Sequence, residues 1–247
     1  MILIVLLLLI LPLEAQHRTI LAVGAHAGDM ELTAGAVLIH QKKLGDKIVL
    51  IHLTLGEGGD PKLSPKDYGD QKRREAIAAA KALGAEVLFG PYKDGELPND
   101  EATRRYVAGV IRQVKPTHII THWKNGIHKD HRNTSAVVAD ALLLAELEAV
   151  DTGHPIYRGV RGIYYAENWE DAEGFQPYLY VNISDELDQW RQSVRNYEFV
   201  RGGISSFPYL DYYEALARIR GAEARRKYAV SFDLDPSSKK VIGDSLP

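Results

Sequence analysis

Two short segments, far apart in the chain, combine histidine with aspartate. The first contains His26 and Asp29, and the second contains His128, Asp130 and His131. Two imidazoles and a carboxylate, with a further position left to water, are a ligand set of catalytic Zn²⁺, and the same set can hold non-haem Fe(II). Because the chain contains no Cys, any metal must be bound by His, Asp or Glu. The alternative use of the two aspartates is to cap the helices that follow them.

The elements that must position these residues alternate between two types from residue 19 onward. Apolar segments predict strands at 19–26, 47–54, 86–91 and 118–122, and helical periodicity predicts helices at 31–45, 65–84, 101–115 and 131–150. Further strands are expected at 161–167, 177–184 and 228–234, with a long helix that starts at a Ser184 or Asp185 cap and a last helix at about 210–227. Apolar strands separated by helices indicate an α/β fold, a Rossmann-like doubly wound, mostly parallel sheet with helices on both faces.

Polar and glycine-rich segments follow the first four predicted strands. They span residues 24–31, 54–60, 92–95 and 122–131. Ligands of open α/β sheets bind beyond the carboxyl ends of the strands. We therefore expect the two His and Asp segments to meet at one edge of the sheet, which favours a metal site over separate helix caps.

The composition excludes several classes of partner and of protein. The chain has 247 residues, 45% of them hydrophobic and 26% charged, which is typical of a folded globular protein. The net charge is −3 and no basic block stands out, so nucleic acid is a poor partner. No internal repeat or low-complexity tract divides the chain, and we expect a single domain over residues 16–247.

The N-terminal segment is apolar from residue 1 to residue 13. A bilayer span needs about 20 such residues, so no stable membrane span is expected, and the run fits the hydrophobic region of a signal peptide. We predict a signal peptide at 1–15, although no Lys or Arg precedes the run. A periplasmic or secreted location follows, and a cytoplasmic one is the alternative.

The two motifs resemble those of a known family, the LmbE/PIG-L-type zinc deacetylases, which remove the acyl group from N-acetylated amino sugars. The family's first motif, Ala-His-Pro-Asp-Asp, aligns without gaps with the segment from Ala25 to Asp29. Its second motif, His-x-Asp-His, is met in full by the segment from His128 to His131. The resemblance extends over about residues 19–232 and implies a zinc-dependent N-deacetylase.

The resemblance also implies a role for each matched residue. The metal ligands would be His26, Asp29 and His131, holding Zn²⁺ or alternatively Fe²⁺ or another divalent ion. His128 would polarise the amide carbonyl or protonate the departing amine, and Asp130 would fix the His128 ring and balance its charge. The substrate, an N-acetylated sugar or glycoconjugate, would contact Asp94 and either Lys72 or its neighbour Arg73.

Gly28 departs from the family pattern, because it occupies the position of the general base, the first Asp of the Asp-Asp pair. Loss of a general base typically costs about 10² to 10⁴ in rate. A catalytically impaired member that binds metal and glycan without turnover is therefore the alternative hypothesis, and Glu31, Glu57 and Asp60 are candidates for a substitute base. A dinucleotide-binding oxidoreductase is disfavoured because the chain has no G-x-G-x-x-G fingerprint.

Overall fold

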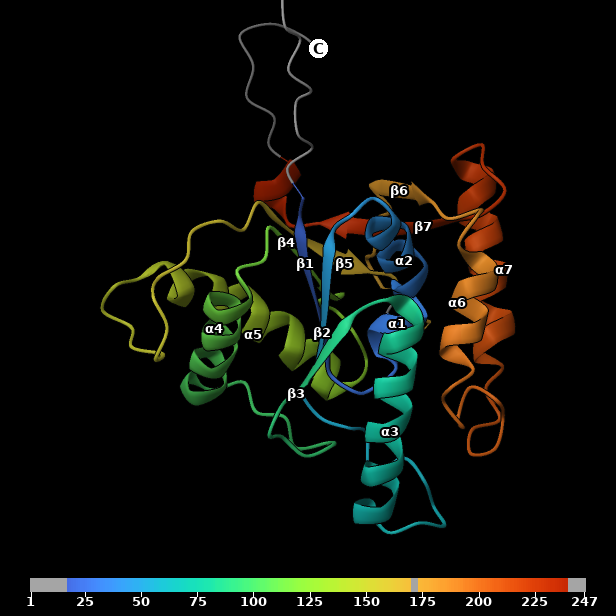
Figure 1. The fold of residues 1–247 in the computed structure, drawn as a ribbon, viewed down its shortest axis with the longest axis horizontal. Coiled ribbons are helices and arrows are strands. Elements are labelled where there is room, and N and C mark those ends of the chain that lie inside the picture. The colour runs from blue at the N-terminus through green and yellow to red at the C-terminus, as the bar shows by residue number, and fades with distance from the viewer. Residues whose placement is uncertain (1–16, 170–172, 240–247) are drawn as a thin grey trace, which may run out of the picture.

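The computed structural model describes residues 17–169 and 173–239, so the predicted signal peptide lies outside the described residues. A seven-stranded sheet with the order β3-β2-β1-β4-β5-β7-β6 forms its centre (Figure 1). The strands are β1 (Thr19–Gly24), β2 (Lys47–His52), β3 (Glu86–Phe89), β4 (His118–His122), β5 (Gly162–Ala166), β6 (Leu179–Asn182) and β7 (Ala229–Leu234). The first five strands run parallel, and β7 is antiparallel to both β5 and β6. The expectation of a mostly parallel α/β sheet is confirmed.

Helices cover both faces of this sheet (Figure 1). They are α1 (Asp29–Thr33), α2 (Gly35–Lys43), α3 (Pro65–Leu83), α4 (Glu101–Val114), α5 (Lys129–Glu146), α6 (Leu187–Val194) and α7 (Tyr209–Glu223), and a 3₁₀ turn follows at Pro236–Lys239. Among the described residues, no helix combines the length and the apolar character needed to cross a membrane.

The side chains of β1 show why its sequence is apolar throughout. Leu21 and Val23 pack into the core on the side of α4 and α5, whereas Ile20 and Ala22 pack into the core on the side of α2 and α6. Successive side chains of a strand point to opposite faces, and both faces are covered here. Every position of the strand from Ile20 onward is therefore buried.

Two helices differ from the sequence prediction. The predicted helix at 31–45 is divided at Ala34 into α1 and α2. The helix predicted to start at a Ser184 or Asp185 cap is a short one, α6, which begins at Leu187. The Ser184 hydroxyl instead donates to Asn182 Oδ1 and accepts the backbone N–H of Tyr228, which ties the end of β6 to the start of β7.

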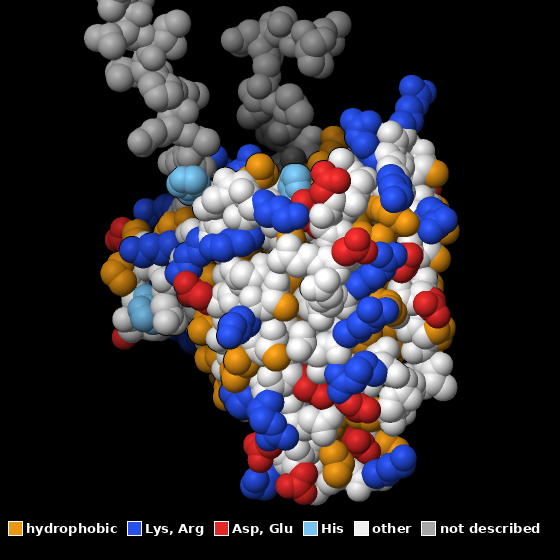
Figure 2. Space-filling model, turned by 45° about the vertical axis from the view of Figure 1, so that its right-hand side comes forward, with side chains coloured by type: hydrophobic (Ala, Val, Ile, Leu, Met, Phe, Trp, Pro, Cys, Tyr) orange, Lys and Arg blue, Asp and Glu red, His pale blue; other side chains and the backbone are white. Residues whose placement is uncertain are grey.

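The surface carries charges of both signs. On the face drawn in Figure 2, Lys and Arg side chains are interspersed with Asp and Glu side chains. This mixture agrees with the small net charge of −3. It gives that face no continuous basic surface of the kind that binds a phosphate backbone.

A close backbone contact holds α7 against the entry to β7. A Cβ atom built on Gly221 would lie 2.7 Å from the Lys227 carbonyl oxygen and 2.8 Å from the Tyr228 Cα. These neighbours are backbone atoms and cannot turn aside, so only glycine fits at this position of the helix.

We expect Gly221→Ala to lower the free energy of unfolding by about 1–3 kcal/mol, since the added methyl group overpacks the contact. Gly109→Ala in α4 is the matched control, because its Cβ would meet only Thr152 atoms at 3.6 Å or more. That change should be neutral or should stabilise the protein by up to about 1 kcal/mol through helix propensity. Urea denaturation of both variants tests the contact, and equal effects would contradict it.

Candidate active site

The loops that follow β1, β2 and β3 border a cavity of about 520 Å³ together with the start of α5. The polar side chains lining it include His26, Asp29, Lys72, Asp94, His128 and His131. Aromatic side chains form another part of its wall, namely Tyr68, Trp169, Phe199, Tyr209 and Tyr213. The predicted meeting of the two His and Asp segments at one edge of the sheet is confirmed.

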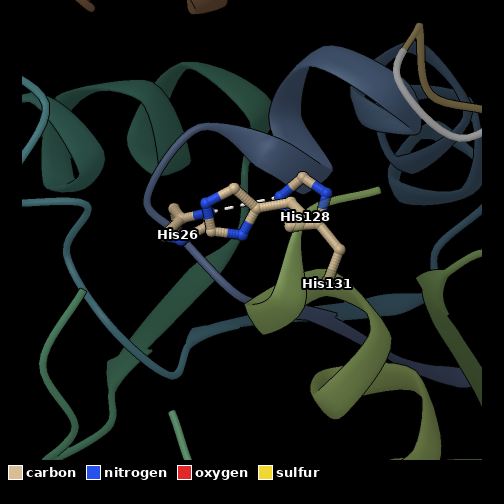
Figure 3. A group of neighbouring side chains, drawn as sticks. All are labelled: His26, His128 and His131. Carbon is tan, nitrogen blue, oxygen red and sulfur yellow. Dashed lines mark hydrogen bonds between the residues drawn. The ribbon is translucent and has the colours of Figure 1, made fainter. Parts of the chain in front are cut away.

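Ligating atoms of three predicted residues face one another in the cavity. His26 Nδ1 lies 3.3 Å from Asp29 Oδ2 and 3.2 Å from His131 Nε2, and the third distance, from His131 Nε2 to Asp29 Oδ2, is 3.5 Å. Figure 3 shows the three imidazoles of the site gathered at the first turn of α5, with His26 entering from the loop after β1. The three atoms form a nearly equilateral triangle.

This triangle fits a tetrahedral metal ion. Bonds of about 2.0–2.1 Å place the ligand atoms of a tetrahedron about 3.3 Å apart. Asp29 Oδ2 also accepts the backbone N–H of His26, which fixes the carboxylate at this place. The donor set of two imidazoles and one carboxylate suits Zn²⁺ and other divalent ions.

Charge interactions around the triangle strongly shift the pKa values of His26 and Asp29. Burial disfavours the charged form of His26, but Asp29, Asp130 and Asp94 outweigh it and raise the pKa of His26 well above its usual value. Burial likewise opposes the charge of Asp29, yet His131, His26 and His122 hold the pKa of its carboxyl well below the ordinary value. A divalent cation bound by these residues would supply the positive charge beside the Asp29 carboxylate in place of a protonated imidazole.

His131 is supported by residues outside both motifs. The Asn168 amide lies 3.3 Å from His131 Nδ1, and Asn168 Oδ1 accepts the Tyr213 hydroxyl at 2.6 Å. The ring of His122 stacks on that of His131, with centroids 4.0 Å apart and the planes at 14°. Neither His122 nor Asn168 belongs to a motif, and the sequence signal for them is their position at or shortly after the ends of β4 and β5.

His128 has the geometry of a neutral hydrogen-bond donor. Its Nδ1 caps α5 by accepting the backbone N–H of Asp130 at 3.2 Å. Burial, helped by the nearby His26 and His131, lowers the pKa of His128 below its usual value. With Nδ1 accepting, the proton of the neutral ring is on Nε2, from which it can form a hydrogen bond to a carbonyl oxygen.

The Asp130 carboxylate has a different partner from the predicted one. Its Oδ2 accepts the backbone N–H of Gly95 at 2.7 Å and lies 3.5 Å from His26 Nε2. Among the described contacts no hydrogen bond joins this carboxylate to His128, whose Nδ1 accepts the Asp130 backbone N–H. The carboxylate still acts on His128 through its charge, which opposes the lowering of the pKa of that imidazole. The helix cap at this end is also His128 and not Asp130.

The structure distinguishes the two basic candidates of α3. Lys72 is only 4% exposed and lines the cavity, where its ammonium donates to the Ala27 carbonyl oxygen and lies 4.1 Å from the ring centre of Phe199. Burial lowers the pKa of Lys72 to about 8. The exposed Arg73 instead lies over the ring of Phe89, outside the cavity lining.

Gly28 adopts a backbone conformation that other residues rarely take, with φ at +109°. A Cβ atom at this position would lie 2.8 Å from Phe199 Cζ. Phe199 thus packs where a side chain at position 28 would begin. At the position where the family resemblance implies a base carboxylate, this chain has no side chain, and the Phe199 ring packs against the backbone.

None of the three candidates for a substitute base is among the described residues that line the cavity. Glu31 is fully buried beneath it, where Oε1 accepts the Tyr197 hydroxyl at 2.6 Å and lies 3.2 Å from His52 Nε2. Glu57 accepts the backbone N–H of Asp94, and Asp60 accepts backbone N–H groups of its own loop. Each carboxylate has a structural use instead.

The hydrogen bond from the Tyr197 hydroxyl to Glu31 joins the segment after α6 to α1, and its removal tests how much it stabilises the fold. We expect Tyr197→Phe to lower the free energy of unfolding by about 1–3 kcal/mol, because a buried carboxylate loses its hydroxyl partner. Tyr178→Phe is the control, since Tyr178 is 56% exposed, and its effect should stay within about 0.5 kcal/mol. Chemical denaturation followed by circular dichroism measures both, and similar losses in the two variants would contradict the assignment.

Comparison with known proteins finds deacetylases and a hydratase. The sequence profile of the PIG-L family, described as GlcNAc-PI de-N-acetylase, matches residues 21–142. A 1D-myo-inositol 2-acetamido-2-deoxy-alpha-D-glucopyranoside deacetylase of Acidothermus cellulolyticus is 29% identical over 155 residues, which cover 51% of this chain and 53% of that protein. The chain therefore spans about half the length of this relative.

Two further relatives align over about nine tenths of the chain. A 4-oxalmesaconate hydratase of Pseudomonas putida is 24% identical over 228 residues, covering 89% of this chain and 86% of that protein. Among solved structures, the N,N'-diacetylchitobiose deacetylase of Pyrococcus horikoshii superposes with a TM-score of 0.78 at 19% identity, covering 90% of this chain and 85% of that one. At that identity the likeness shows a shared fold.

Proposed function

The chain belongs to the PIG-L family, and on this premise we propose that it is a metal-dependent hydrolase that removes an acyl group, acetyl in the simplest case, from an N-acylated amino sugar or its conjugate. The triangle of His26, Asp29 and His131, with ligand atoms 3.2–3.5 Å apart, is the observation that carries the proposal. It lies in a cavity beside an imidazole donor, His128, as hydrolysis of an amide requires.

The three residues of the triangle would hold Zn²⁺, or Fe²⁺ or another divalent ion of similar preference. When bound, such an ion acidifies a coordinated water and polarises a carbonyl group. The remaining chemistry falls to the side chains of the cavity.

His128 would polarise the amide by donating a hydrogen bond from its Nε2–H to the carbonyl oxygen. The departing amine would take up the proton that the attacking water loses. The Nδ1 of His128 is occupied by the backbone of α5, so the ring keeps this orientation through the reaction. Lys72 and the aromatic wall would hold the sugar. Lys72 would donate a hydrogen bond to an oxygen of the substrate, because it lines the cavity. Its ammonium lies beside the Phe199 ring.

Position 28 supplies no carboxylate to take a proton from water. The hydrolysis should therefore be slower than with a base, by about 10² to 10⁴. Among the described lining residues the carboxylates are Asp29, in the triangle, and Asp94, which pairs with His26.

A hydratase is the second candidate, and the alignment to a hydratase over 89% of the chain favours it. Addition of water to a carbon–carbon double bond conjugated to a carboxylate uses the same activation of water and of a carbonyl oxygen. It expels no amine, so it makes a different demand on proton transfer. The buried ammonium of Lys72 would pair with the carboxylate of such a substrate.

Metal content is the first test. We expect about one divalent ion per chain by mass spectrometry of the metal, and its loss in His131→Ala, because a three-ligand open site loses one of its ligands. His154→Ala is the matched control, since this exposed histidine lies outside the cavity lining. Unchanged metal content in His131→Ala would refute the site.

A substrate panel separates the candidate activities. Released acetate is measured on N-acetylglucosamine and its conjugates, and loss of the double-bond absorbance is measured on unsaturated dicarboxylates. Turnover of the first group supports the deacetylase, and turnover of the second alone supports the hydratase. A protein that binds metal and sugar with neither activity is the impaired binder.

Placing a carboxylate at position 28 tests whether Phe199 blocks a base there. Gly28→Asp alone should destabilise the protein without raising the rate, because its Cβ meets Phe199 and the backbone disfavours it. In Gly28→Asp/Phe199→Ala the space is open, and we expect deacetylation to rise by up to about 10² over Phe199→Ala at equal metal content. A rate gain in Gly28→Asp alone would show that Phe199 does not close the position.

A further inference from the structure

We propose that Asp94 is a positioning residue for the metal, holding the His26 ring through Nε2 so that Nδ1 faces the ion. This inference rests on the metal site proposed above. It gives Asp94 a different role from the substrate contact that the family resemblance implies.

The two nitrogens of His26 face different surroundings. Nδ1 faces Asp29 Oδ2 and His131 Nε2, the other two corners of the triangle. Nε2 points to the opposite side, where Asp94 Oδ1 lies at 3.1 Å and Asp130 Oδ2 at 3.5 Å. A histidine that binds a metal through one nitrogen usually gives the proton of the other to a carboxylate, which fixes its tautomer and orientation.

Asp94 is the nearer carboxylate, and it is itself held in place. Its Oδ2 accepts the backbone N–H of Gly58 at 3.0 Å, and its own N–H donates to Glu57 Oε1 at 3.0 Å. The carboxylate therefore spans two loops, with one oxygen on the loop after β2 and the other on His26. An anchored partner of this kind restricts the ring more than a free surface aspartate would.

The turn that carries Asp94 is tied to the second motif as well. The Gly95 N–H donates to Asp130 Oδ2, and the Gly95 carbonyl oxygen accepts the Lys129 ammonium at 3.1 Å. The left-handed φ of +74° at Gly95 makes this tight turn possible. Through the turn at 93–95, the first motif, the loop after β2 and the start of α5 are joined around one imidazole.

The same contacts argue against a direct sugar contact. Asp94 lines the cavity, but its side chain is only 18% exposed and each of its oxygens has a partner. A hydroxyl group of a substrate would have to compete with His26 or with the Gly58 N–H. A role in orienting His26 uses the carboxylate as the structure holds it.

The test measures zinc affinity by chelator competition in Asp94→Ala, Asp94→Asn and the wild type. We expect Asp94→Ala to weaken zinc binding by about 10- to 100-fold. Asp94→Asn should lose less, because the amide oxygen can still accept from Nε2 while the negative charge is gone. Long-range ¹H–¹⁵N spectra of the zinc-loaded proteins should show the His26 ring protonated at Nε2 in the wild type and a mixture of tautomers in Asp94→Ala.

Asp60→Ala is the control for loss of a carboxylate, because Asp60 bonds only to its own loop in the described contacts. It should bind zinc like the wild type. Equal zinc affinity in wild type and Asp94→Ala, with only KM for the substrate raised, would overturn the inference in favour of a substrate contact. A wild type that binds no zinc would instead refute the metal site itself, so the two failures are distinguishable.

Discussion

The partly buried carboxylate of Asp29 is the group around which the site is built. It accepts the His26 backbone N–H and lies within 3.5 Å of ring nitrogens of His26, His122 and His131. An unpaired buried charge costs several kcal/mol, so a carboxylate in this place requires cationic or metal partners. The doubly wound sheet supplies them, because β1 and β4 are neighbours and both end at this edge.

The packing around Gly28 suits a residue without a side chain. Where the family motif has a carboxylate, this chain has a glycine at φ +109°, a phenylalanine ring in contact with it and a buried ammonium over that ring. A cation facing an aromatic ring in a desolvated place is stabilised by the ring quadrupole, which offsets part of the cost of burying the ammonium. The substitution at one motif position therefore agrees with the packing around it.

The same constellation is compatible with more than one reaction of water. The relatives include deacetylases and a hydratase, and their fold is shared. A metal triangle, a neutral imidazole donor and a buried cation can serve addition of water to an amide or to a conjugated double bond. The two reactions differ in the proton donors and acceptors that they need in the cavity. In this chain, position 28 supplies no carboxylate as an acceptor.

The sequence by itself determined the sheet class, the edge at which the site forms and the two His and Asp segments that meet there. These follow from local signals, namely apolar strands of alternating exposure to two cores and short motifs at strand ends, whereas the choice of His26, Asp29 and His131 as metal ligands is what the family resemblance implies. Tertiary packing decided what those signals leave open. Lys72 and Arg73 are neighbours in one helix, and only the docking of α3 sets which of them enters the cavity. Asp94, Asn168 and Phe199 reach the site from distant segments, so their contacts with His26, His131 and Gly28 depend on how loops far apart in sequence are brought together.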